Sequence, residues 1–179
     1  MPASTSSTVT IAIAVIVVAI IIIGAVALAR RNRSKSMQDR FGPEYERAVR
    51  ESGGSRADAE RELARRQERV KRMHIEELPA GAKTRYTEEW RTVQTRFVDE
   101  PEAALIKADR LITNVMRDRG YTVDNYDQTV ADLSPDHPNV LQNYRTAHDI
   151  TRRSETGEVT TEDLRQAMVQ YRSLFDDLM

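Results

Sequence analysis

The residues of this 179-residue chain whose types and spacing could do chemistry are three histidines and several carboxylates. His148 and Asp149 are adjacent, and such a His-Asp pair supplies metal ligands in one class of helical phosphohydrolases. That class also needs a His well upstream and a distal Asp on another helix, whereas His137 is 11 residues away and is bracketed by prolines. A small metal-dependent hydrolase that uses His137, His148 and Asp149 is therefore kept only as an alternative function.

A structural interpretation of the same residues is favoured. His148 is expected to be a partly exposed side chain near a helix surface. His137 and Asp136 precede Pro138 and are expected to cap the helix that follows it. Adjacent acids such as Glu76 and Glu77 do not face each other on a helix, so they do not form acid/base dyads.

Other catalytic patterns are missing from the sequence. There is no Cys, which removes thiolate nucleophiles and Cys-ligated metals, and no phosphate loop, GxSxG or HExxH motif. Outside residues 9–29 the chain is highly charged and poor in aromatic residues, which argues against most enzyme architectures. We predict that the protein is not an enzyme, with no catalytic residue, metal or cofactor.

Residues 9–29 (VTIAIAVIVVAIIIIGAVALA) predict a membrane anchor. Nineteen of these 21 residues are apolar and none is charged, and about 20 such residues suffice to cross a bilayer as a helix. A cleaved signal peptide is the alternative, because Ala27-Leu28-Ala29 resembles a cleavage site. Against cleavage, residues 1–8 carry no cation and the apolar stretch exceeds the usual length of about 7–15 residues.

A basic cluster follows the apolar segment directly and consists of Arg30, Arg31, Arg33 and Lys35. By the positive-inside rule it places the N-terminus outside the cell membrane and the C-terminal part in the cytoplasm. Residues 30–72 have a net charge of +6 and residues 73–179 a net charge of −7. The acidic distal half argues against nucleic acid as a partner, whereas the basic segment leaves an anionic-lipid surface sensor as a further alternative.

Helical periodicity and breaks set the domain organisation, and no strand signal is present. The predicted fold is all-α, with a single N-terminal transmembrane helix, a charged helical stalk and a four- or five-helix bundle. The corresponding ranges are a tail (1–8), the transmembrane helix (9–29), a basic juxtamembrane linker (30–42), the stalk (43–78) and the bundle (79–179).

Apolar stripes predict the core and leave a partner surface open. Tyr86, Trp90, Val93 and Phe97 recur at helical spacing and are interpreted as core. The stalk helix has only a thin stripe that includes Leu63 and Val70, so it either docks on the bundle or pairs with another chain. A candidate partner surface combines these two residues with three from the last helix, and its members are Leu63, Val70, Tyr171, Phe175 and Leu178.

Three stretches, RFVDEPEAALIKADRLITNVMRDRGY (96–121), ADLSPDHPNVLQNYRTAHDI (131–150) and EDLRQAMVQYRSLFDDLM (162–179), resemble a family of uncharacterised bacterial membrane proteins. Members combine an N-terminal hydrophobic anchor, a charged linker and a helical C-terminal domain. Thr122 departs from the pattern, which has Pro after the Gly-Tyr pair. The resemblance implies this architecture and transfers no functional residue. The function that we predict is a membrane-anchored cytoplasmic interaction or scaffolding module, which binds an unknown protein or itself.

Overall fold

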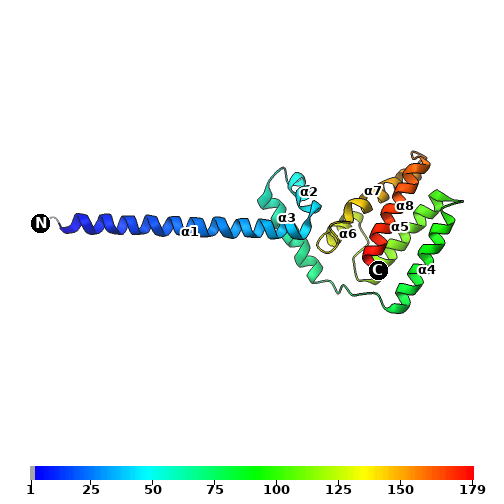
Figure 1. The fold of residues 1–179 in the computed structure, drawn as a ribbon, viewed down its shortest axis with the longest axis horizontal. Coiled ribbons are helices and arrows are strands. Elements are labelled where there is room, and N and C mark those ends of the chain that lie inside the picture. Colours follow the sequence, from blue (N-terminus) through cyan, green and yellow to red (C-terminus); the bar gives the residue numbers. More distant parts are fainter. Residues whose placement is uncertain (1–2) are drawn as a thin grey trace. The chain divides into compact units, whose positions relative to one another are not determined.

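The computed structural model describes the backbone of residues 3–179 and the side chains of residues 17, 18, 20–29 and 31–179. This part of the chain contains eight α-helices and no strand, which confirms the all-α prediction. The chain divides into two compact units, Met1–Asp39 and Arg40–Met179. Helix α1 (Ala3–Phe41) supplies the first unit, and the other seven helices described belong to the second (Figure 1).

The expected transmembrane segment, residues 9–29, lies within α1. The side chains of residues 9–16 and of Ala19 fall outside the described part. Among the residues that the structure does describe, no helix is both long enough and apolar enough to cross a membrane. Of the basic cluster, Arg31, Arg33 and Lys35 are exposed, while the side chain of Arg30 also falls outside the description.

The segment predicted as a linker, residues 30–42, is helical as far as Phe41. The reason is its composition, because it has neither Gly nor Pro before Gly42 and is rich in residues of good helix propensity. Gly42 then adopts a positive φ of 47°, and Pro43 occupies the first turn of the next helix. The predicted break at this point is confirmed.

Helices α2 (Pro43–Glu51) and α3 (Arg56–Lys71) contact each other within the second unit. Ser55 caps α3 by accepting a hydrogen bond from the Asp58 N–H at 3.3 Å. The Tyr45 hydroxyl donates to Glu60 at 3.1 Å and joins the two helices. The thin apolar stripe of α3 is buried, and α3 also contacts α6. The helix predicted as a stalk therefore belongs to the same compact unit as the bundle.

Five further helices form the main core: α4 (Ala80–Arg96), α5 (Pro101–Asp118), α6 (Tyr126–Leu133), α7 (Leu141–Ser154) and α8 (Thr161–Leu178). Contacts join α4 to α5, α5 to α8 and α8 to α7, so these four helices lie side by side in that order (Figure 1). The prediction of a four- or five-helix bundle is confirmed in outline.

The aromatic stripe of α4 faces this core, as predicted. Tyr86, Trp90 and Val93 are buried, and Phe97 is partly buried against the same cluster. The Trp90 ring stacks on Phe175 of α8 with ring centroids 4.7 Å apart and an interplanar angle of 14°. The only Trp in the sequence thus lies at a contact between α4 and α8 and can report on their packing.

Gly120 ends α5 in a conformation that only Gly accommodates here. Its φ is +101°, and a Cβ at this position would lie 2.3 Å from the carbonyl oxygen of His74. The neighbouring Arg119 carbonyl accepts a hydrogen bond from the Glu76 N–H at 3.0 Å. The connection between α3 and α4 is therefore held close to the C-terminus of α5, which explains why the chain has Gly at the predicted cap.

One local prediction needs correction. Helix α7 has Val140 as its N-cap and no side-chain cap, so Asp136 and His137 do not cap it. The helix begins at Leu141, three residues after Pro138, and both side chains have other partners: Asp136 pairs with Arg40 and His137 with Asp177.

Candidate functional site

The five residues of the candidate partner surface are all buried within the chain. Leu63 and Val70 of α3 are 0% and 7% exposed. Tyr171, Phe175 and Leu178 of α8 are at most 4% exposed and belong to the main core cluster. These side chains do not form a surface that a partner could reach, because their apolar groups are already covered by other helices of the same chain.

His137 is buried and belongs to a hydrogen-bonded chain of three residues. Its Nδ1 lies 2.5 Å from Oδ2 of Asp177 on α8, and its Nε2 lies 3.1 Å from the Tyr121 hydroxyl. Burial raises the pKa of Tyr121 to about 12, so the phenol keeps its proton. Tyr121 is 3% exposed, so this Asp-His-Tyr chain does not present its hydroxyl to a substrate and instead ties α8 to the connections that flank α6.

His148 lies in a second network, with Asp109 as its acceptor. The Asp109 carboxylate of α5 is 3.2 Å from Nδ1 of His148 and accepts a hydrogen bond from the Tyr171 hydroxyl at 2.8 Å. Burial and the negative charge of Asp109 raise the pKa of Tyr171, which keeps the phenol protonated as a donor. The His148 ring is partly exposed, as predicted, and stacks on Tyr126 with ring centroids 4.1 Å apart.

The alternative metal site is not assembled in the structure. His137 contacts Asp177, His148 contacts Asp109, and Asp149 pairs with Arg153 at 3.3 Å. Among the described residues, no group of three or more His, Asp or Glu side chains could hold a metal ion.

A polar crevice of about 520 Å³ lies where α2, α3, α6 and α7 meet. Four guanidinium groups line it, together with the stacked rings of Tyr126 and His148. The cations come from three different helices and are Arg47 of α2, Arg66 of α3, and Arg145 and Arg152 of α7. This size is typical of a small-molecule site, and three carboxylates line it beside the four guanidinium groups: Glu51, Asp127 and Asp149.

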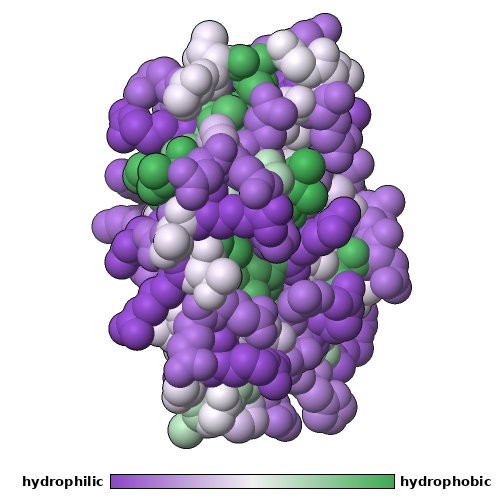
Figure 2. Space-filling view, turned by 90° about the vertical axis from the view of Figure 1, so that its right-hand side faces the viewer, coloured by the Kyte–Doolittle hydropathy of each residue, from purple (hydrophilic) through white to green (hydrophobic). Residues whose placement is uncertain are grey.

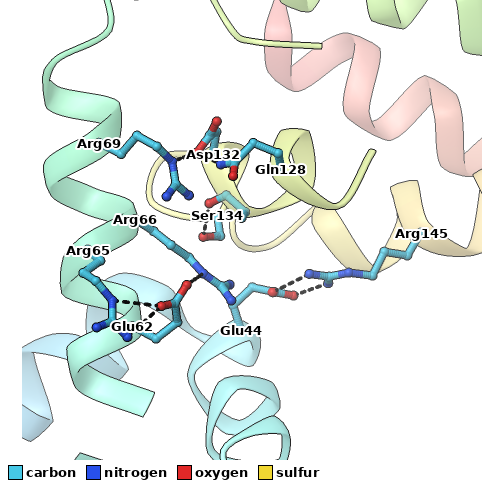
Figure 3. Close-up of polar contacts among 10 residues, drawn as sticks. Glu44, Glu62, Arg65, Arg66, Arg69, Gln128, Asp132, Ser134 and Arg145 are labelled. Carbon is cyan, nitrogen blue, oxygen red and sulfur yellow. Dashed lines mark hydrogen bonds and ion pairs between the residues drawn. The ribbon is translucent and has the colours of Figure 1, made fainter. Parts of the chain in front are cut away.

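Buried ion pairs hold the walls of this crevice together. Arg145 of α7 donates two hydrogen bonds to Glu44 of α2, at 2.5 Å and 2.7 Å. The side chain of Glu44 is 3% exposed and that of Arg145 is 13% exposed, so water hardly screens the pair. Figure 3 shows Arg66 and Arg145 extending toward each other from α3 and α7, with the Glu44 carboxylate between them.

A second ion pair joins α3 to α6 near the crevice. Arg69 donates to Oδ1 of Asp132 at 2.6 Å, and Gln128 donates to the same oxygen at 2.8 Å (Figure 3). The Asp132 side chain is 0% exposed, and its Oδ2 has no hydrogen-bond partner among the described residues. Because an isolated carboxylate is costly to bury, Arg69 fixes how α3 docks on α6.

Arg66 and its neighbour Arg65 both donate hydrogen bonds to the carboxylate of Glu62. Partial burial raises the pKa of Glu62, but hydrogen bonds from Arg66 and Arg65 outweigh this effect and hold the pKa below its usual value. Only Nε of Arg66 is engaged by Glu62, at 3.2 Å. The Arg66 side chain is 14% exposed and lines the crevice, whereas that of Arg65 is 69% exposed and does not.

The crevice cations also act on the Tyr126 ring. Burial raises the pKa of Tyr126 to about 12, and the positive charges of Arg145 and Arg47 oppose that rise. These guanidinium groups are therefore close enough to the ring to influence the pKa of its hydroxyl. Sequence analysis missed this arrangement, since the residues concerned lie on polar faces of their helices and are up to about a hundred positions apart.

The face drawn in Figure 2 is mainly hydrophilic, with hydrophobic groups in small separate patches. Outside α1, the exposed large apolar side chains of the described residues are Val98 and Val169. Comparison with protein-family models, curated proteins and solved structures found no match. The resemblance to a family of bacterial membrane proteins therefore stays a prediction.

Proposed function

We propose that the protein is a single-pass membrane protein whose unit Arg40–Met179 lies in the cytoplasm and binds another protein or a second copy of itself. The observation that supports a membrane anchor is the apolar surface of α1. In the described residues from Val17 to Leu28, the large apolar side chains are 46% to 68% exposed. A helix that is apolar on all sides needs lipid or protein around it.

The sequence of residues 9–29 supports a lipid environment rather than a protein one. The 21 residues contain no charge and are followed at once by four cations in six residues. That order is typical of an anchor whose C-terminal side stays in the cytoplasm. The unit Arg40–Met179 then carries the charged surface and the crevice through which the tethered protein can act.

The interaction is tested by cross-linking in cells with a C-terminally tagged full-length chain. A matched control joins residues 1–39 to an unrelated soluble domain with the same tag. We expect a cytoplasmic or inner-membrane protein, or the chain itself, to be cross-linked to the full-length protein and not to the control. Equal recovery of every cross-linked protein by the two chains would contradict an interaction role for Arg40–Met179.

A further inference from the structure

The crevice between α2, α3, α6 and α7 is lined by cations from three of these helices. Arg145, His148 and Arg152 are spaced three and four residues apart on α7, so they share one face of that helix. All three line the crevice, and Arg66 of α3 lines it as well. A ligand in this space would therefore meet guanidinium groups from two helices.

Some of the guanidinium N–H donors on α3 and α7 form no hydrogen bond among the described residues. Glu62 accepts from Nε of Arg66, and no hydrogen bond engages the two terminal NH₂ groups of Arg66 among the described residues. Arg152 is exposed and has no ion pair among the described residues. Arg145 differs, because both its terminal nitrogens donate to Glu44.

The acids that line the crevice form no ion pair with Arg66 or Arg152 among the described residues. Glu51 pairs with Arg47 at 2.8 Å, and Asp149 pairs with Arg153, which lies outside the lining. Asp127 is the remaining lining acid and lies in the first turn of α6, where an acid is favoured by the helix dipole. The Arg152 guanidinium and the terminal nitrogens of Arg66 are thus left for a ligand.

We propose that this crevice binds a phosphate group, with Arg66 and Arg152 donating to its oxygens and the Tyr126 and His148 rings forming one wall. Planar guanidinium groups donate pairs of hydrogen bonds to phosphate oxygens, and these charge-assisted bonds are stronger than neutral ones. Arg66 is held in place by burial and by Glu62, so little side-chain entropy is lost on binding. The proposal concerns the unit Arg40–Met179 and does not depend on the anchor.

The first arm of the test uses inorganic pyrophosphate and the full-length chain in a nonionic detergent. Thermal unfolding is followed by Trp90 fluorescence at an ionic strength held constant with NaCl. Binding should give a saturable rise in Tm of about 3–6 °C at tenfold excess over Kd. Arg152→Gln should weaken binding about tenfold or more. Because Arg152 is exposed and forms no ion pair, this variant is expected to fold normally.

Neighbouring arginines provide the matched controls. Arg153→Gln removes the next cation on α7, and Arg65→Gln removes the other guanidinium that shares Glu62, yet neither residue lines the crevice. Both controls should retain the full response to pyrophosphate, while Arg66→Gln should lose it as Arg152→Gln does. A response that all four variants lose equally would reveal general attraction of anions to a basic surface and would overturn the proposal.

The second arm distinguishes a soluble phosphate compound from a lipid headgroup. The chain is reconstituted in phosphatidylcholine vesicles with or without a minor fraction of phosphatidic acid. A soluble ligand is indicated if pyrophosphate raises Tm equally in both vesicles, and a headgroup if phosphatidic acid itself raises Tm and blocks the response. Both results support a phosphate site. No rise in Tm with pyrophosphate or with phosphatidic acid would overturn it.

Discussion

Two lysines placed at Ile20 and Ile21 are expected to release the full-length chain from the membrane. Both positions lie near the middle of residues 9–29, where each Lys costs about 2.5–3.5 kcal/mol on insertion scales. Together they cost about 5–7 kcal/mol, which is more than a thousandfold in the insertion equilibrium. Lys has good helix propensity, so the substitution acts on the transfer into lipid and leaves the helix intact.

The measurement is the fraction of the chain that stays in the membrane pellet after extraction with alkaline carbonate. A matched control, Asn32→Lys with Ser36→Lys, adds the same charge to exposed positions of α1 beyond the apolar segment. We expect the wild type and this control to stay in the pellet and the Ile20→Lys, Ile21→Lys variant to be extracted. A variant that stays in the pellet as fully as the control would show that residues 9–29 do not hold the chain in lipid.

Loss of the Arg145 side chain is expected to cost about 3–5 kcal/mol in the free energy of unfolding. The Arg145→Ala variant leaves the Glu44 carboxylate, 3% exposed, without its two hydrogen bonds from the guanidinium group. Coulombic attraction in a poorly hydrated site no longer compensates the desolvation of that carboxylate. The effect should appear in urea unfolding of the full-length chain in nonionic detergent, followed by Trp90 fluorescence.

An exposed ion pair on α8 provides the comparison for this prediction. Arg172 pairs with Asp176 four residues later, and the two side chains are 55% and 59% exposed. Arg172→Ala should cost less than about 1 kcal/mol. Replacing both buried partners, with Glu44→Leu and Arg145→Met, should recover much of the loss. If Arg145→Ala costs no more than Arg172→Ala, the ion pair does not join α2 to α7 as we infer.

The sequence predicts the helices of the second unit well because local signals determine them. Ser55 and Thr160 stand at the beginnings of α3 and α8 and cap them, the latter through a capping box with Asp163. Gly120 stands at the end of α5, and the aromatic stripe on α4 has the spacing of one helix face. Each of these signals acts over a few residues, which is the range that a pattern in one sequence can reveal.

The candidate site could not be predicted in the same way, because it depends on which helices are neighbours. Periodicity shows which face of a helix is apolar but does not identify the helix that covers it. Glu44 and Arg145 are 101 residues apart and stand on faces that appear solvated in the sequence. The burial of Asp132 is only weakly indicated by the sequence, in which it lies between Ala131 and Leu133 at the end of a short apolar helix. The same limit explains why the sequence predicts His137 as a helix cap, whereas its ring pairs with Asp177 of α8.

The dense charge of α3 illustrates how composition can leave the partner of a helix open. Its stripe of Ala59, Leu63 and Val70 is narrow, which is compatible with docking on the bundle or with pairing with another chain. In the structure α3 docks on the bundle, because Arg69 pairs with the buried Asp132 and the apolar stripe itself is covered. A small apolar area is sufficient when a buried ion pair fixes the register of the contact.

Labelling of single cysteines in intact cells tests most directly whether the chain is anchored with Arg40–Met179 in the cytoplasm. The chain has no Cys, so Ser6→Cys and Glu155→Cys each introduce a unique thiol, the second at an exposed position after α7. With a membrane-impermeant maleimide, we predict that the Ser6→Cys chain is labelled in intact cells and the Glu155→Cys chain only after permeabilisation. Labelling of the Glu155→Cys chain in intact cells would contradict the account and favour an exported protein.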